Sequence, residues 1–230
     1  IEDPIEYEMS GITQVQVMPQ IGLDFARGLR SMLRHDPDVM MVGEVRDLET
    51  AEIAIRVALT GHLVLSTLHT NDAASGVTRL LDMGVEKYLI PTTLSLAIAQ
   101  RLVRRLCDDC KKKKKPEKAI QELLLSTIQE LPEKTKKQLP IGESGENFTV
   151  YEPGGCKKCG ASGYSGRIAI MEAMEISETL SELILTEASE TKVQEQAQQE
   201  GMITMRQDGM LKALDGVTTV EEIIRVTSDA

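Results

Sequence analysis

The hydrophobic positions of this chain change their spacing several times, and the changes mark the expected elements. Nearly continuous apolar runs at 38–42 and 62–68 are typical of strands that are covered on both faces of a sheet. Over 25–33, Phe25, Leu29 and Leu33 recur at helical spacing. For the first 106 residues the pattern predicts strands at 1–7, 12–17, 38–42 and 62–68, and helices at 25–33, 47–58, 72–84 and 92–106.

The order strand, helix, strand, helix is the order of a parallel sheet with crossover connections, so the expected fold class is α/β. Asp24 and Asp47 stand where each can cap the helix that follows it. Gly61 and Gly84 stand where helices are expected to end.

The pattern changes after residue 110. A run of five lysines opens a segment, 111–146, that is punctuated by Pro and Gly, including Pro140, Gly142 and Gly145. We expect one amphipathic helix there, near 117–130, and otherwise a mobile insertion. Beyond it we expect a strand at 167–176 and helices at 178–187, 191–201, 205–214 and 219–226.

Two features of the C-terminal part carry further expectations. Thr219 and Glu222 have the spacing of a capping box. The segment 172–200 is rich in Glu, from Glu172 to Glu200, which predicts a solvated acidic face. Together these patterns predict three domains: 1–106, 107–163 and 164–230.

Composition narrows the class of protein. The 230 residues include 26 Lys and Arg against 36 Asp and Glu, a formal net charge of −10, which argues against a surface that binds nucleic acid throughout. A hydrophobic content of 41% is too high for a disordered chain. No apolar stretch approaches the roughly 18 residues of a membrane span, and no signal peptide is apparent. Because the chain opens inside an expected strand, we expect it to be cut from a larger protein.

Four cysteines form two Cys-x2-Cys pairs, Cys107 with Cys110 and Cys156 with Cys159. Without a secretion signal a reducing compartment is expected, and there such pairs favour a metal over disulfides. Each pair supplies two thiolates, so the four together suit the tetrahedral coordination of Zn²⁺. Two reduced pairs or a disulfide are the alternatives.

Three segments place polar groups where expected strands end. Segment 1–7 carries Glu2 and Asp3, and carboxylates at the carboxyl end of an α/β strand point into the ligand crevice. Segment 39–47 is an apolar run that ends in Gly43 and Glu44, similar to a Walker B element, whose carboxylate holds Mg²⁺ through water or orients the attacking water. A solvated strand end is the alternative in each case.

The third segment, 60–72, ends in hydroxyl and amide groups around His69, where an imidazole can donate a hydrogen bond to a γ-phosphate. His35 and His62 lack this setting, and we interpret both as structural. In order, the three segments resemble the Asp box, Walker B element and His box of the secretion ATPase superfamily, in particular the assembly ATPases of type IV pili and type II secretion. The resemblance continues through 78–84, 99–102, the four cysteines, 160–167 and 201–227.

The resemblance implies a RecA-like P-loop ATPase domain, partial in this chain, with a tetracysteine zinc element and a C-terminal helical subdomain. It implies that Glu2 is the catalytic base or water-orienting residue, that Glu44 acts with Mg²⁺, and that His69 is the sensor. Asp3 would support the same site.

The resemblance also implies arginine fingers, which reach the nucleotide from a neighbouring subunit of a ring. Arg34 and Arg79 match them, and Arg30, one helical turn from Arg34, is a further candidate. Solvated helix charges are the alternative for all three.

The implied parent protein is a homohexameric ATPase with ATP, Mg²⁺ and Zn²⁺ as cofactors. It would be cytoplasmic, bound at the inner membrane only through its partners, and would push on a polytopic inner-membrane platform protein. The family's Walker A loop, Gly-x4-Gly-Lys-Ser/Thr, occurs nowhere in the 230 residues. We expect that loop just upstream of residue 1 in the parent, and we expect this chain alone to be inactive.

Basic residues near the cysteines support an alternative function. These residues, here called the basic strip, are Arg101, Arg104, Arg105 and 111–115, and a solvated surface is the alternative interpretation. They would suit a zinc-binding interaction module that contacts nucleic acid or acidic membrane or protein surfaces. No aromatic residues interleave them, so we expect no nucleic-acid partner.

Overall fold

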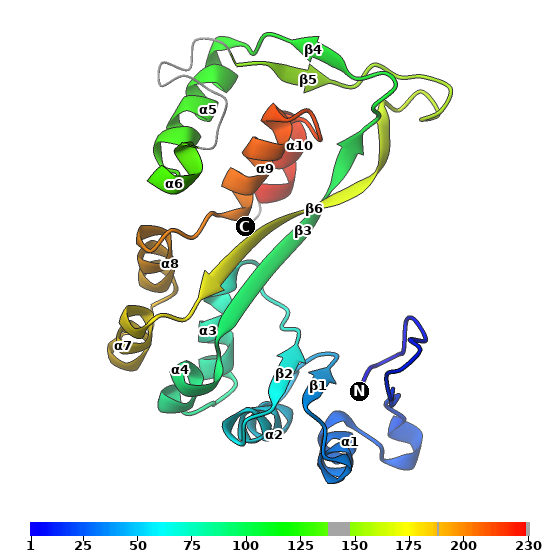
Figure 1. Ribbon diagram of the computed structural model, residues 1–230, viewed down its shortest axis with the longest axis vertical. Coiled ribbons are helices and arrows are strands. Elements are labelled where there is room, and N and C mark those ends of the chain that lie inside the picture. Colours follow the sequence, from blue (N-terminus) through cyan, green and yellow to red (C-terminus); the bar gives the residue numbers. More distant parts are fainter. Residues whose placement is uncertain (138–147, 188, 229–230) are drawn as a thin grey trace. The chain divides into compact units, whose positions relative to one another are not determined.

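The computed structural model describes residues 1–137, 148–187 and 189–228, and the chain divides into two compact units (Figure 1). The first unit contains Ile1–Thr70, Ala74–Ser95 and Ile176–Val193. The second contains Asn71–Ala73, Leu96–Glu175 and Gln194–Ala230. Both units contain helices and strands, and the first has the order strand, helix, strand, so the predicted α/β class is confirmed. The three-domain division stays a prediction.

A parallel strand pair lies in the first unit. Strands β1 (Val39–Val42) and β2 (Leu63–Ser66) pair with Val39 opposite Leu63, and helix α2 (Leu48–Leu59) connects them. The predicted parallel pairing with a helical crossover is therefore confirmed. The Asp47 side chain accepts a hydrogen bond from the N–H of Thr50 and caps α2, as expected.

The expectation that both strands are covered on both faces is wrong for the described chain. Met40 and Val42 are buried, but Val39 is 54% exposed and Leu63 56% exposed. Successive side chains of a strand point to opposite faces, and here only one face of the pair is packed. An uninterrupted apolar run does not by itself show that both faces are covered.

The strands expected at 1–7 and 12–17 do not form, which is a second correction. Glu2 makes only an isolated parallel bridge with Gln16, in which the N–H of Glu2 donates to the carbonyl of Val15. Pro4 has no N–H with which to extend a ladder. The 3-10 turns η1 (Pro19–Ile21) and η2 (Leu33–His35) flank helix α1 (Phe25–Met32), whose N-cap is Asp24 as predicted.

Short helices complete the first unit. Three of them lie wholly in this unit: η3 (Lys87–Leu89), α4 (Ile90–Thr93) and α7 (Glu178–Thr186). Helix α3 (Ala73–Asp82) belongs to it from Ala74 onward, and α8 (Glu190–Gln199) as far as Val193. Helices α4 and α7 pack against each other, and Ile90 and Leu180 are fully buried.

The helix expected over 92–106 is also wrong. Only α4 is helical there, and β3 (Leu96–Leu106) pairs antiparallel with β6 (Tyr164–Glu175), with Leu96 opposite Glu175. Apolar residues recur in this segment at both the helical and the strand spacing, so the pattern fits a helix as well as a strand. The pairing with β6, more distant in sequence, decides the structure.

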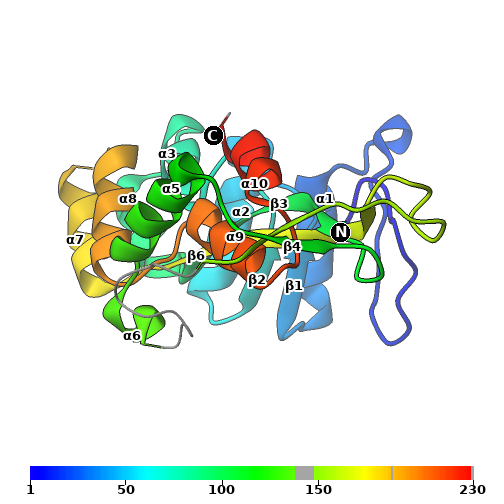
Figure 2. The same ribbon diagram turned by 90° about the horizontal axis from the view of Figure 1, so that it is seen from above.

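The core of the second unit lies between this ribbon and two C-terminal helices. Helices α9 (Met205–Leu214) and α10 (Val220–Thr227) lie side by side in both views (Figures 1 and 2) and pack against β3 and β6. The buried core residues are Val103, Leu124, Phe148, Val150, Ile170, Met205, Met210, Ala213, Val220 and Ile223.

Part of the expected mobile insertion is instead ordered structure. Helix α5 (Lys118–Gln129) forms where it was predicted and buries Leu124 completely. Strand β4 (Lys112–Lys114) pairs antiparallel with β5 (Val150–Glu152), and α6 (Glu133–Lys136) follows α5. Pro140, Gly142 and Gly145 lie outside the described residues.

Side chains of the C-terminal helices close the outer edges of the β3–β6 ribbon. Asp208 accepts a hydrogen bond from the N–H of Met171 at 2.8 Å, and Lys212 donates to the carbonyl of Ala169 at 2.9 Å. On the other edge, Glu222 accepts from the N–H of Arg104 at 3.0 Å. Such caps satisfy backbone groups that an edge strand would otherwise offer to another chain.

The capping box predicted at Thr219 and Glu222 is only half formed. The Thr219 hydroxyl accepts from the N–H of Glu222, but the Glu222 carboxylate binds Arg104 and Arg225. The reciprocal capping box is at the start of α9, between Thr204 and Gln207.

Candidate functional site

Gly43 joins the three polar segments of the first unit. Its N–H donates to the carbonyl of Ile1 at 2.8 Å, and its carbonyl accepts from the Thr67 hydroxyl at 2.6 Å. A Cβ at this position would lie 3.1 Å from the Ile1 oxygen and 3.3 Å from Cα of Glu2. Glycine therefore allows the backbone before Glu2 and the strand end before Glu44 to approach closely.

Glu44 receives two side-chain hydrogen bonds. Nη2 of Arg46 donates at 2.5 Å and Nε2 of His69 at 2.8 Å. The Glu44 side chain is 13% exposed, whereas the His69 ring is 79% exposed. The hydrogen bond from Arg46, and then that from His69, lowers the pKa of Glu44. The arrangement keeps a carboxylate ionised at a strand end with an imidazole beside it.

Arg46 was not predicted as a site residue. Besides Glu44 it approaches Asp3, with 3.8 Å between Nη1 and Oδ2, and so links the two acidic segments. A signal was present in the sequence: Glu44 and Arg46 are two residues apart in an extended segment and therefore share a side.

Glu2 is held by a residue that sequence reasoning also missed. The Gln14 amide donates to Oε1 of Glu2 and to the carbonyl of Tyr7, both at 2.9 Å, and its oxygen accepts from the N–H of Met9 at 2.8 Å. Gln14 thus closes the loop after Glu2 on itself. Nothing in the sequence pattern marks this residue.

The predicted arginines lie apart from this cluster. Arg30 forms an ion pair with Glu49 at 2.6 Å. Both side chains are more than half exposed, so the pair contributes little to the stability of the fold. Arg34 lies in η2 and Arg79 in the last turn of α3, and both are exposed. Over the described residues, no hydrogen bond or ion pair joins these arginines to Glu2, Glu44 or His69.

The four cysteines of the second unit come together. Their sulfur atoms all lie within 4.8 Å of one another. Three Sγ–Sγ distances are 3.9 Å (Cys107–Cys156), 3.8 Å (Cys110–Cys159) and 3.7 Å (Cys156–Cys159). A disulfide needs about 2.05 Å, so none is formed. A tetrahedron with Zn–S bonds of about 2.3 Å has edges of about 3.8 Å, which these distances fit.

Backbone packing fixes the two cysteine turns. A Cβ on Gly154 would lie 2.0 Å from the carbonyl oxygen of Cys110, so only glycine allows this approach. The N–H groups of Cys156 and Gly163 donate to Sγ of Cys159 and lower its pKa to about 6. Desolvation raises the pKa of Cys110 to about 12.

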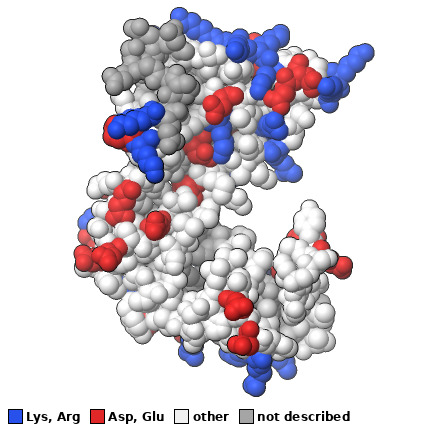
Figure 3. Space-filling view, in the orientation of Figure 1, with Lys and Arg blue, Asp and Glu red and all other residues white. Residues whose placement is uncertain are grey.

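Lys and Arg side chains gather around the cysteine turns and β4 (Figure 3). Several are paired with local carboxylates: Lys111 and Arg105 with Asp108, both at 2.8 Å, and Lys158 with Asp109 at 2.7 Å. This pairing supports the interpretation of the basic strip as a solvated surface.

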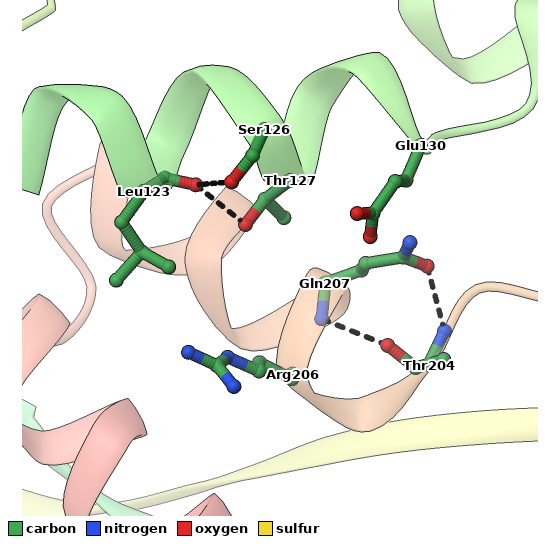
Figure 4. A pocket seen from close by; sticks show the side chains of 7 residues that line it. All are labelled: Leu123, Ser126, Thr127, Glu130, Thr204, Arg206 and Gln207. Carbon is green, nitrogen blue, oxygen red and sulfur yellow. Dashed lines mark hydrogen bonds between the residues drawn. The ribbon is translucent and has the colours of Figure 1, made fainter.

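A hollow of about 200 Å³ lies between α5 and α9 (Figure 4). Its side chains are largely engaged in local structure, since Thr204 and Gln207 form the capping box and Thr127 donates to the carbonyl of Leu123. Its lining is Leu123, Ser126, Thr127, Glu130, Thr204, Arg206 and Gln207.

A family model described as "Type II/IV secretion system protein" matches residues 1–225. The chain belongs to this family. It is 48% identical over 227 residues to the type IV pilus assembly ATPase PilB of Myxococcus xanthus and 46% identical over 230 residues to the type II secretion system ATPase E of Vibrio cholerae. Each match includes 99% or more of this chain, but only 38% of the Myxococcus protein and 42% of the Vibrio protein. The chain therefore spans less than half the length of these relatives.

Solved structures support the fold. The chain is similar to the pilus retraction motor PilT with bound ADP at a TM-score of 0.62 and 26% identity, covering 98% of this chain and 51% of that one. The ATPase DotB of Legionella pneumophila matches at a TM-score of 0.64 and 22% identity over 99% of this chain and 50% of that one, a likeness of fold alone. Among the described helices, none has the length and apolar character of a membrane span.

Proposed function

We propose that this chain is part of an ATP-hydrolysing motor that assembles a type IV pilus or a type II secretion pseudopilus. The observation that carries the proposal is the ionised Glu44 with His69 hydrogen-bonded to it, joined through Gly43 to the segment that bears Glu2. This cluster occurs in a chain that is 48% identical to a pilus assembly ATPase.

Each residue of the cluster has a chemical task in this proposal. Glu2 orients or deprotonates the attacking water, and Asp3 supports it through Arg46. Glu44, a carboxylate of lowered pKa, would hold Mg²⁺. His69 donates a hydrogen bond to the γ-phosphate. Bound Mg²⁺ and ATP would supply the phosphoryl group and the cation that neutralises its charge.

The exposed arginines belong to the same proposal. Arg34 and Arg79, with Arg30 as a weaker candidate, would reach the nucleotide of a neighbouring subunit in a homohexamer. Their exposure and their separation from Glu2 and Glu44 are what a contact made in trans requires.

The proposed place in the cell follows from the proposed task. The motor would be cytoplasmic and peripheral to the inner membrane, held there by a polytopic platform protein on which it pushes. Nucleic acid has no part in the proposal, and the local pairing of the basic strip supports that view.

The cysteine cluster is proposed to hold one structural Zn²⁺ through Cys107, Cys110, Cys156 and Cys159, which supports the turns between β3 and β6. Elemental analysis of protein purified without added metal should find close to one zinc per chain. Cys107→Ser should lower the zinc content and speed amide exchange mainly between residues 107 and 163. A zinc-free wild type whose thiols react freely, with unchanged stability, would remove the site from the account.

Complementation tests the proposed function. In Myxococcus xanthus, the matched segment of PilB is replaced by this chain, and surface pili are counted. The chimaera should assemble pili, and the same chimaera with Glu44→Gln should not. Glu49→Gln, an exposed carboxylate outside the cluster, is the matched control and should leave pili in place. Pili in the Glu44→Gln strain at the level of the control would contradict the proposal.

A further inference from the structure

Hydrogen bonds fix the main chain at Glu2. Its N–H donates to the carbonyl of Val15 at 3.0 Å, and its carbonyl accepts from the N–H of Val17 at 2.9 Å. Just before it, the carbonyl of Ile1 accepts from the N–H of Gly43 at 2.8 Å. The backbone of Glu2 is therefore held between two segments, and the direction of its carboxylate depends on what binds the side chain.

The side chain of Glu2 is bound by Gln14. Nε2 of Gln14 donates to Oε1 of Glu2 and to the carbonyl of Tyr7, both at 2.9 Å. Oε1 of Gln14 accepts from the N–H of Met9 at 2.8 Å. Within the described part of the chain, no group donates a hydrogen bond to Oε2 of Glu2. One carboxylate oxygen is thus held, and the other remains able to meet a water molecule.

These three contacts need a side chain that both donates and accepts. A carboxylate and a carbonyl oxygen accept hydrogen bonds, whereas a backbone N–H donates one. An amide has two N–H donors and a carbonyl acceptor, so Gln14 satisfies all three partners in a single orientation. An ionised glutamate at this position would have no donor for Glu2, and a methionine would have none for Glu2 or for Tyr7.

The loop between Glu2 and Gln14 has little other support. Over 3–13, all of which the structure describes, the one internal backbone hydrogen bond runs from the N–H of Ile12 to the carbonyl of Met9, at 3.3 Å. Gln14 is half-buried, whereas every residue of 8–13 is exposed. The contacts with the loop backbone therefore hold the amide of Gln14 in place, and the amide in turn holds Glu2.

We propose that Gln14 is a positioning residue for Glu2. It fixes one carboxylate oxygen and so leaves Oε2 to orient the attacking water. Its contacts with the main chain at Tyr7 and Met9 keep the amide from rotating away. The inference rests on the proposed function in taking Glu2 as the residue that acts on water.

ATP turnover by the purified PilB chimaera that carries this chain, measured at pH 8, tests the inference. Gln14→Met keeps the length of the side chain and removes all three hydrogen bonds. Gln14→Glu keeps an acceptor for the N–H of Met9 but replaces the donor to Glu2 by a carboxyl that is ionised at this pH. Both should lower kcat by about 10- to 100-fold, with the KM for ATP changed by less than about twofold. Gln14→Glu should be the slower of the two, because two carboxylates then repel each other.

Gln16 provides the matched control. It lies two residues along the same segment and is exposed, and among the described residues none forms a hydrogen bond with its side chain. Gln16→Met and Gln16→Glu should leave kcat within about twofold of the wild type. Amide exchange at Met9, measured by NMR on the 230-residue chain, reports the loop separately: it should quicken in Gln14→Met and stay near the wild-type rate in Gln14→Glu.

Wild-type kcat in Gln14→Glu, or a higher kcat in Gln14→Glu than in Gln14→Met, would overturn the inference, because the contact with Met9 would then be the one that matters. A raised KM with unchanged kcat would overturn it as well, since Gln14 would then serve nucleotide binding. If Gln14→Met does not fold, the comparison of Gln14→Glu with Gln16→Glu decides alone. A wild-type chimaera without ATP turnover would contradict the proposed function itself, and with it the role of Glu2 on which this inference rests.

Discussion

Glu222 has hydrogen-bond partners for both its backbone N–H and its side chain. Its N–H receives the predicted cap from Thr219, yet its carboxylate, fully buried, binds Arg104 and Arg225. Desolvation favours the neutral acid, but the hydrogen bonds from Arg104 and Arg225 outweigh it and lower the pKa of Glu222 to about 2. Arg225 is three residues from Glu222 in the same helix, but the sequence spacing could not reveal Arg104, which lies on a strand more than a hundred residues away.

Glu222→Gln should destabilise the protein by about 2 to 3 kcal/mol, because the charge that pairs both guanidinium groups is removed from a buried position. The free energy of unfolding is measured by urea denaturation at pH 7. Glu221→Gln, one residue earlier and exposed, is the control and should change it by less than about 0.5 kcal/mol. Equal effects of the two substitutions would show that the buried pair contributes nothing.

The same contact predicts a pH dependence. A carboxyl whose pKa is lowered on folding, here from an ordinary 4.5 to about 2, stabilises the folded state at pH values above 4.5. That contribution is lost as the pH falls from 4.5 towards 2. The difference in unfolding free energy between wild type and Glu222→Gln should therefore be constant from pH 7 to pH 5 and shrink below pH 4.5. A difference that grows on acidification would contradict the assignment.

At the scale of elements, local signals were reliable wherever the sequence itself supplies the partner. The N-caps Asp24 and Asp47 and the C-terminal helices lie where the spacing predicts them. The strand β3 was missed because its pairing partner is β6, which no local spacing reveals. The expectation of a solvated acidic face over 172–200 is wrong at Glu172 for the same reason: this carboxylate is buried and accepts from the N–H groups of Ala73 and Met205, both distant in sequence.

Packing between α9 and α10 gives a prediction for Gly209. A Cβ at Gly209 would lie 2.7 Å from Cδ1 and 2.9 Å from Cγ2 of Ile223, which is fully buried. Gly209→Ala should therefore lower the melting temperature, since overpacking of about 1 to 3 kcal/mol exceeds the gain in helix propensity of about 1 kcal/mol.

Gly76→Ala is the matched control for this prediction. Gly76 also lies within a helix, α3, but its nearest contact for a Cβ is 3.9 Å away. This substitution should be neutral or stabilising by up to about 1 kcal/mol. Thermal unfolding followed by circular dichroism compares the two, and a melting temperature raised by both alanines would show that α9 and α10 pack less tightly than described.

At the scale of the whole molecule, the sequence was sufficient for the family and the class of fold. Three polar segments in order and two cysteine pairs led to the resemblance, and the family match over residues 1–225 confirms it. The geometry within the candidate site was less accessible. Gln14 could not be identified without knowing which backbone segments lie against Gly43, whereas Arg46 is only two residues from Glu44, and that spacing was a usable signal.

A ring assembled from two defective forms tests the role of the arginines in trans. PilB chimaeras that carry this chain with Arg34→Ala or with Glu2→Gln are each expected to hydrolyse ATP poorly. Mixed rings should recover activity, because some interfaces pair an intact carboxylate with an intact arginine, and such arginines are worth about 10³- to 10⁵-fold. ATP hydrolysis is measured after mixed rings are shown to form. Activity no greater than the sum of the separate forms would assign Arg34 to its own subunit.

Magnesium-dependent ATP turnover by the purified PilB chimaera tests the central claim most directly, because it asks whether the Glu2, Glu44 and His69 cluster of this chain performs the chemistry. The chimaera should hydrolyse ATP, while the isolated 230-residue chain, whose sequence contains no Gly-x4-Gly-Lys-Ser/Thr loop, should not. Glu44→Gln should reduce turnover by about 10²- to 10⁴-fold with nucleotide binding retained. Undiminished turnover in Glu44→Gln would contradict the account.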